Sequence, residues 1–154
     1  MIVVNRLSTE QAERNFEVLT DFYYKNSKAC SSMESFIRED AEAKIESMIA
    51  HIKDNTAIVF GGFDNDELVG YIWAYRIKFR DEDRVYVSEV HVSEKCRGQG
   101  LGHLLLSAVE EEARKIEGVT ALYIHTEADN AGAIRLYERE NYQMERVQMR
   151  KALI

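Results

Sequence analysis

The sequence is poor in three features that identify common classes of protein: cysteines, long apolar runs and an excess of basic residues. Its 154 residues include two cysteines, Cys30 and Cys96, which are too few for a disulfide framework and lack metal-ligand spacing with the four histidines. No run approaches the roughly 18 unbroken apolar residues of a membrane-spanning helix. Met1 leads straight into a strand-like IVV instead of an export signal. We therefore expect a soluble, cytoplasmic protein that binds no metal and no membrane.

Acidic residues outnumber basic ones by 27 to 20, for a net charge of −7 at pH 7. Proteins that bind nucleic acids neutralise phosphates with clustered Lys and Arg, so this balance argues against a nucleic-acid partner. It favours cationic partners instead. The length is typical of one compact domain, and we expect residues 1–154 to form a single domain.

Two helices are predicted to follow an N-terminal strand at residues 2–7. Each helix is preceded by a pair with the spacing of a capping box, in which a hydroxyl and an amide or carboxylate satisfy backbone N–H groups. The two pairs are Ser8 with Gln11 and Ser31 with Glu34. The first helix is therefore expected to begin at Thr9, and apolar residues at helical spacing carry the second to about Lys53.

The rest of the sequence predicts a sheet with a crossover. The expected strands are residues 57–63, 68–79, 85–92 and 120–128. Short links make the first three antiparallel, whereas about 20 residues between the last two allow a helix and parallel neighbours. A helix capped by Asp129 or Asn130 and ended by Asn141 precedes one or two closing strands in residues 142–153. The fold class is therefore α/β of the α+β type: a mixed, mainly antiparallel sheet of six to seven strands flanked by helices on both faces.

The stretch RGQGLG, residues 97–102, places three glycines between a strand and a leucine-rich helix. A helix N-terminus has unpaired N–H groups and a partial positive charge, so glycines there predict an anion site, usually for phosphate. The spacing matches neither G-x-x-x-x-G-K-[ST] nor G-x-G-x-x-G. A tight turn that binds nothing, and a phosphate-binding regulatory domain, are the alternatives.

Two short patterns stand about 30 residues apart in the second half of the sequence. The first is Arg97, Gly100 and Gly102, with the form [QR]-x-x-G-x-[GA], and the second is Asn130, Ala133 and Tyr137, with the form N-x-x-A-x-x-x-Y. Together they resemble the signature of the GNAT acetyltransferase superfamily, strongly over residues 84–143 and through element order over the whole chain. The resemblance implies the GNAT-like acyl-CoA N-acyltransferase fold and an enzyme that uses acetyl-CoA as its donor.

The resemblance also implies where acetyl-CoA binds. In that superfamily the backbone N–H groups of the glycine turn bind the pyrophosphate, and the preceding strand lends its main chain to the pantetheine arm, much as an added strand pairs with a sheet edge. The implied cofactor-binding residues are Val90, His91, Val92, Arg97, Gly98, Gln99, Gly100, Leu101, Gly102, His103, Asn130, Ala133 and Tyr137.

Acetyl transfer needs a neutral amine, and an amine of pKa about 10.4 must lose a proton at pH 7. Glu89, which interrupts an apolar strand, is the first candidate for the base, and His125 and a chain of water molecules are the others. The face on which Glu89 lies stays open, because a bulge would exchange the faces. Tyr137 resembles the superfamily tyrosine that protonates the departing thiolate, which makes it the expected general acid.

The sequence departs from the superfamily pattern at Ser93-Glu94, where relatives often have proline, at Glu140-Asn141, where they often have Leu-Gly, and at Ser88, where some have an acid. The last departure leaves the base open. We expect an acetyl-CoA-dependent N-acetyltransferase whose acceptor, a cationic primary amine of a small molecule or peptide, attacks directly in a ternary complex. The alternative is a non-catalytic acyl-CoA-binding module that senses or regulates. A homodimer is the common symmetric assembly for such a chain.

Overall fold

A five-stranded mixed sheet organises the protein, whose computed structural model describes residues 1–30 and 33–154. The strands are β1 (Ile2–Arg6), β2 (Ile58–Asp64), β3 (Glu67–Phe79), β4 (Glu82–Val92) and β5 (Val119–Ile124), paired in that order. The helices are α1 (Thr9–Arg14), α2 (Phe16–Lys28), α3 (Arg38–Lys53), α4 (Leu101–Arg114) and α5 (Ala131–Arg139). The first three strand pairings are antiparallel and β4–β5 is parallel, so the predicted meander and crossover are confirmed. None of the helices in the described ranges is long and apolar enough to cross a membrane.

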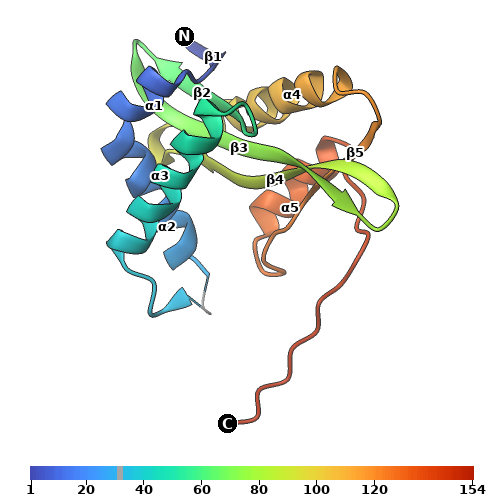
Figure 1. Cartoon of the computed structure of the whole chain (residues 1–154). Helices are drawn as coiled ribbons and strands as arrows, with labels where there is room; N and C mark the ends of the chain where they lie inside the picture. Colours follow the sequence, from blue (N-terminus) through green and yellow to red (C-terminus); the bar gives the residue numbers. More distant parts are fainter. Residues whose placement is uncertain (31–32) are drawn as a thin grey trace.

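Helices cover both faces of the sheet (Figure 1). On one face, α2 and α3 bury Leu19 and Ile45 against a cluster that includes Tyr71 of β3. On the other, α4 buries Leu105 in a cluster that includes Val85 of β4. This division follows from the alternation of side chains along each strand, which sends successive residues to opposite faces.

The start of α1 was predicted correctly, whereas the start of α3 was predicted wrongly. Ser8 and Gln11 form both hydrogen bonds of a capping box, and α1 begins at Thr9. The helix is then interrupted at Asn15, so α1 and α2 are separate. α3 begins only at Arg38, because the Asp40 carboxylate accepts a hydrogen bond from the Ile37 N–H at 3.0 Å and caps the helix there. The predicted cap at Ser31 lies outside the described residues.

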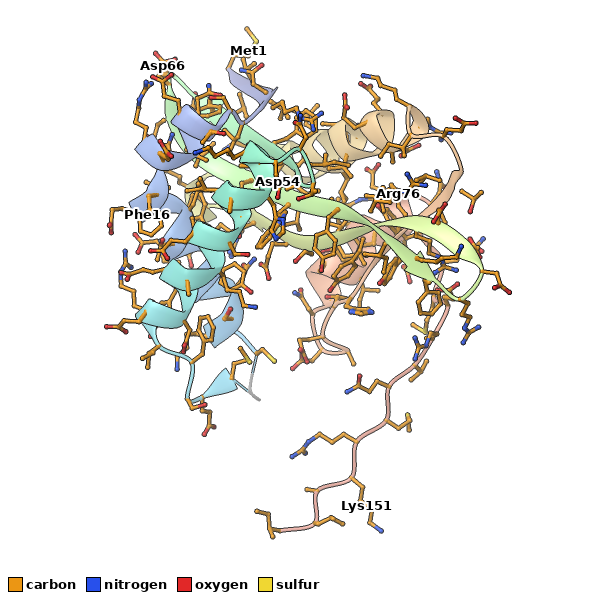
Figure 2. The ribbon with its side chains drawn as sticks, viewed as in Figure 1. Met1, Phe16, Asp54, Asp66, Arg76 and Lys151 are labelled. Atoms are coloured by element: carbon orange, nitrogen blue, oxygen red, sulfur yellow. The ribbon has the colours of Figure 1, made fainter. Side chains whose placement is uncertain are left out.

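The sheet has five strands, so the predicted six to seven strands are wrong. Within the described residues no strand follows α5, and residues 143–154 are exposed. The Glu145 carboxylate accepts two hydrogen bonds from the Arg84 guanidinium, at 2.6 and 2.7 Å, and the Arg146 guanidinium lies 5.4 Å from the Phe79 ring centroid. These contacts lead the chain past the β3–β4 hairpin, and the rest of the tail, including Lys151, stands clear of the protein (Figures 1 and 2). A strand exists only where its backbone pairs with another strand, and alternation alone does not produce that pairing.

Candidate active site

The glycine turn before α4 owes its shape to two of its three glycines. Gly98 and Gly100 have φ angles of 77° and 83°, and Gly100 is the N-cap of α4. Residues with a side chain rarely adopt this left-handed backbone conformation, whereas glycine adopts it without strain. A Cβ at either position would meet no atom within 4 Å, so the backbone there is open to approach. The N–H groups of the first turn of α4 have no acceptor within the helix, so they are available to an anion, and the anion site stays a prediction.

Gly102 is required for a different reason, which is packing. A Cβ at Gly102 would lie 2.9 Å from Cδ2 of Leu136, so this glycine lets α4 approach α5 closely. Three neighbouring side chains are engaged within the chain. Arg97 Nε donates to the Val92 carbonyl at 3.2 Å, Gln99 Nε2 donates to the Lys95 carbonyl at 3.1 Å, and His103 Nδ1 lies 2.5 Å from Glu140 Oε1. The capacity of the turn to bind an anion therefore resides chiefly in its main chain.

Strands β4 and β5 part in the middle of β4. Their pairing register ends at Val87 and Ile124, although β4 continues to Val92. The Ser93 N–H donates to the Val69 carbonyl of β3 at 2.8 Å, so alternation turns the main-chain groups of Val90 and Val92 away from β3. These two predicted cofactor-binding residues thus present main-chain groups where β5 no longer pairs. The main chain of His91, the third, faces β3.

A β-bulge decides the face on which Glu89 lies. Glu89 pairs with Trp73 and Val87 pairs with Ala74, so Ser88 is the extra residue. The bulge exchanges the faces: Val85 and Val87 pack on the α4 side, whereas Glu89 points to the side covered by α1–α3. The sequence left this question open.

Burial makes the Glu89 carboxyl an unusually basic group. Desolvation raises its pKa from 4.5 to about 7, and a hydrogen bond from Asn26 of α2 opposes that rise. Asn26 Nδ2 lies 2.9 Å from Glu89 Oε2. A carboxyl with a pKa near neutrality can accept a proton and release it at the same pH, which is the property a general base needs.

His91 lies next to this pair on the same face. Its Nδ1 is 2.7 Å from Asn26 Oδ1, and its ring stacks on Phe22 with centroids 4.5 Å apart. Burial, followed by the positive charges of Arg97 and Lys25, lowers the pKa of His91 to about 4. The imidazole is therefore neutral near pH 7.

The second motif has a structural meaning at each position. The Asn130 side chain accepts a hydrogen bond from the Ala133 N–H at 3.1 Å and caps α5, and Ala133 packs against the core under α4. Tyr137, one turn further along α5, is 8% exposed. Burial, and then the nearby Glu89 carboxylate, raise the pKa of Tyr137 to about 12. Asn130 and Ala133 thus position the helix that carries Tyr137.

His125 follows the end of β5 and is exposed. Its Nδ1 lies 3.4 Å from the Tyr86 hydroxyl, and its ring is 5.3 Å from that of Tyr86 and 5.6 Å from that of Tyr123. Tyr86 in turn contacts Tyr75 at 5.5 Å and Tyr123 at 4.8 Å. His125 therefore belongs to a row of aromatic rings on the sheet, which we call the aromatic row: Tyr75, Tyr86, Tyr123 and His125.

Sequence reasoning missed Asn26 and the aromatic row. Asn26 stands in an ordinary amphipathic helix, and no motif distinguishes it. The aromatic row had a signal in the sequence, because Tyr123 and His125 are two residues apart in the strand predicted at residues 120–128 and were therefore expected to share a face. Across the part of the chain that the structure describes, no group of three or more His, Cys, Asp or Glu side chains could hold a metal ion.

Comparisons with known proteins agree with this geometry. A sequence model of the Acetyltransferase (GNAT) family matches residues 14–142. The "Uncharacterized N-acetyltransferase YdgE" of Bacillus subtilis (strain 168) is 32% identical over 117 residues, which are 75% of this chain and 74% of YdgE. Two solved structures share the fold. A tetramutant of the BH1408 protein of Bacillus halodurans has a TM-score of 0.81 at 16% identity, covering 98% of this chain and 99% of that one. The aminoglycoside acetyltransferase meta-AAC0020 from an uncultured soil metagenomic sample, in complex with sisomicin, has a TM-score of 0.73 at 16% identity, covering 99% and 97%.

Proposed function

This chain belongs to the GNAT family and is an acetyltransferase, and we propose that it transfers the acetyl group of acetyl-CoA to a primary amine of a small molecule or peptide. The amine attacks the thioester directly while both substrates are bound. The observation that carries the proposal is the buried carboxyl of Glu89, which lies on β4 where that strand parts from β5. A buried carboxyl with a pKa near neutrality is typical of active sites, which favours an enzyme over a non-catalytic binding module.

The donor is proposed to lie along β4 with its pyrophosphate at the glycine turn. The N–H groups of residues 98–103 suit a diphosphate, because charge-assisted hydrogen bonds to main-chain N–H groups add about 1.5 to 3 kcal/mol each. The outward-facing N–H groups of Val90 and Val92 suit the carbonyls of the pantetheine arm, whereas the carbonyls of these two residues already accept hydrogen bonds from Asn26 and Arg97. Gly102 and Asn130 support this site by packing and capping.

Glu89 is proposed to act as the general base. Holding an amine of pKa about 10.4 in its neutral form at pH 7 costs about 4.6 kcal/mol, so a group must take up the proton. An ordinary carboxylate is too weak a base for this, but burial brings the pKa of Glu89 to about 7. His125 suits the role less well, because it is exposed and contacts Tyr86.

Tyr137 is proposed to protonate the departing thiolate of coenzyme A. Its raised pKa, about 12, keeps the phenol protonated at every pH at which the protein works. A thiol of pKa about 8.5 is the stronger acid. The phenol therefore donates a hydrogen bond as negative charge develops on the sulfur. When the carbon–sulfur bond breaks, its proton passes to the thiolate, and the phenolate, which is the stronger base, regains a proton from solvent.

The acceptor is proposed to lie between α2 and the aromatic row. Ring faces attract cations, and the net charge of −7 attracts them from a distance. Arg84, a cation on the same face, is already paired with Glu82 and Glu145. This environment favours an amine on a partly apolar skeleton. The structural neighbour bound to sisomicin makes an aminoglycoside a second acceptor worth testing.

Two measurements test the proposed function. Calorimetric titration with acetyl-CoA should show binding, and free thiol should be released when spermidine, kanamycin, tyramine, lysine or a peptide with a free N-terminus is added. Glu89→Gln should bind acetyl-CoA normally and lose about 100-fold or more in kcat, the usual contribution of a general base. Unchanged turnover in this variant would remove Glu89 from the mechanism, and the absence of heat with acetyl-CoA would refute the donor site.

A further inference from the structure

The side-chain amide of Asn26, near the end of α2, lies at the centre of three hydrogen bonds. Its Nδ2 is 2.9 Å from Glu89 Oε2 and 3.0 Å from the carbonyl oxygen of Val90. Its Oδ1 is 2.7 Å from His91 Nδ1. One side chain thus joins the helix on the acceptor side to three consecutive residues of the donor strand.

The direction of all three bonds follows from what each partner can do. The ionised carboxylate of Glu89 and the carbonyl of Val90 can only accept, so they use both hydrogens of the Asn26 amide. Oδ1 must then accept, which makes His91 Nδ1 the donor. His91 is neutral near pH 7, so it carries its proton on Nδ1 and its Nε2 is unprotonated.

We infer that Asn26 is the positioning residue of the general base, and that its amide selects the ionised, proton-accepting form of Glu89 and fixes it relative to the Val90 carbonyl. The inference rests on the proposed function, since it assumes that Glu89 takes the proton of the amine. The inference gives α2 a second role besides lining the acceptor site: through Asn26, this helix orients the Glu89 carboxylate of β4.

The surroundings of Glu89 explain why one amide matters. The other groups that face it are phenols: Tyr23 of α2, Tyr71 of β3, Tyr86 of β4 and Tyr137 of α5, each of which has a raised pKa with Glu89 among the causes. These phenols are neutral at pH 7, and burial disfavours the carboxylate. The hydrogen bond from Asn26 is the contribution that favours the ionised form.

Two variants separate this role from a purely structural one. Asn26→Leu keeps the approximate volume and excludes water, but it cannot donate or accept. Asn26→Asp can still accept from His91, but as a carboxylate it cannot donate to Glu89, and its negative charge opposes ionisation of Glu89. The matched control is Asn15→Leu. Asn15 precedes α2, and its Nδ2 donates to the Gln11 carbonyl at 2.9 Å, far from the site.

The decisive measurement is the titration of Glu89, followed by NMR of protein labelled with ¹³C at the glutamate carboxyl and assigned with Glu89→Gln. The Glu89 midpoint should move to higher pH in Asn26→Leu, further in Asn26→Asp, and not at all in Asn15→Leu. The acidic limb of kcat/KM, measured by thiol release with acetyl-CoA and the fastest amine of the panel, should move in the same order. At pH 6.5 both Asn26 variants should lose about tenfold or more in kcat, since less of the base is ionised.

Each outcome bears on the inference. An unchanged Glu89 midpoint in Asn26→Leu overturns it, whatever happens to the rate. Near-normal behaviour of Asn26→Asp also overturns it, because that variant retains only the bond to His91. If the midpoint moves but Glu89→Gln remains fully active, the hold of Asn26 on Glu89 stands and the proposed base is wrong. An equal loss in Asn15→Leu would show that the effect belongs to α2 as a whole.

Discussion

Replacing Glu89 by Gln should stabilise the folded protein at alkaline pH while it removes activity. Gln has nearly the same shape and can accept the hydrogen bond from Asn26, but it carries no ionisable proton. In the wild type, burial raises the pKa of Glu89 from 4.5 to about 7. Ionising this carboxyl therefore costs more in the folded chain than in the unfolded chain.

The sign and size of the effect follow from linkage. Below pH 4.5 Glu89 is protonated in both states, and its contribution to the free energy of unfolding is fully present. Between pH 4.5 and 7 the unfolded chain releases the proton first, so stability falls as pH rises. A rise of about 2.5 pH units in the pKa corresponds to about 3 kcal/mol at 1.36 kcal/mol per unit. Above pH 7 the loss is complete.

Urea unfolding at a series of pH values from 4 to 9 measures this directly. Subtracting the free energy of unfolding of the wild type from that of Glu89→Gln at each pH removes the contributions of the other titrating groups, which both proteins share. It should grow by about 3 kcal/mol between pH 4 and pH 8 and then remain constant. A difference that stays flat across this range would show that Glu89 titrates normally, and the argument for a buried general base would fail with it.

Three further predictions concern the rest of the site. Tyr137→Phe should lower kcat by about 100-fold or more while the Kd for acetyl-CoA, measured by calorimetry, stays unchanged; an unchanged kcat would exclude its role as the acid. Gly100→Ala should weaken acetyl-CoA binding, because the left-handed conformation costs a side chain about 1 to 2 kcal/mol, whereas Gly102→Ala should lower the melting temperature by crowding α5. Equal effects of the two on binding would contradict the separate roles of these glycines. Glu145→Gln should release the tail from Arg84, so trypsin should cleave faster after Arg146, while cleavage after Arg150 and Lys151, which are already exposed, should not change; cleavage after Arg146 at the wild-type rate would mean that the ion pair does not hold the tail.

Most of the fold could be predicted from short-range patterns in the sequence. The capping box of Ser8 and Gln11 and the cap at Asn130 are bonds between residues three positions apart, so their spacing is visible in the sequence. Gly100 was predictable for a similar reason, since a turn between a strand and a helix often needs a residue with positive φ. The late start of α3 was not predictable in this way, because Asp40 caps the helix at Ile37 and nothing in the sequence favours this cap over the pair Ser31 and Glu34.

The sequence indicated which residues to consider for the candidate site, but not how their side chains are arranged in space. Alternation along β4 placed Glu89 with Val85 and Val87, and only the bulge at Ser88 turns it to the other face. A bulge is a property of two paired strands, and one strand read alone does not reveal it. Asn26 and Glu89 are 63 residues apart, and their hydrogen bond follows from how α2 packs on the sheet.

The ion pair between Arg84 and Glu145 divides the C-terminal segment into an attached part and a loose one. The Arg84 guanidinium lies 4.6 Å from the Phe79 ring centroid and 5.6 Å from that of Tyr123, and Arg84 is buried, so the attachment point is well packed. Residues 147–154, all of them exposed, extend beyond it. A purification tag appended at that end would therefore hang from an exposed segment whose anchor lies beside Tyr123 of the aromatic row, whereas a shortened protein ending at Arg146 would keep the anchor and lose the exposed segment.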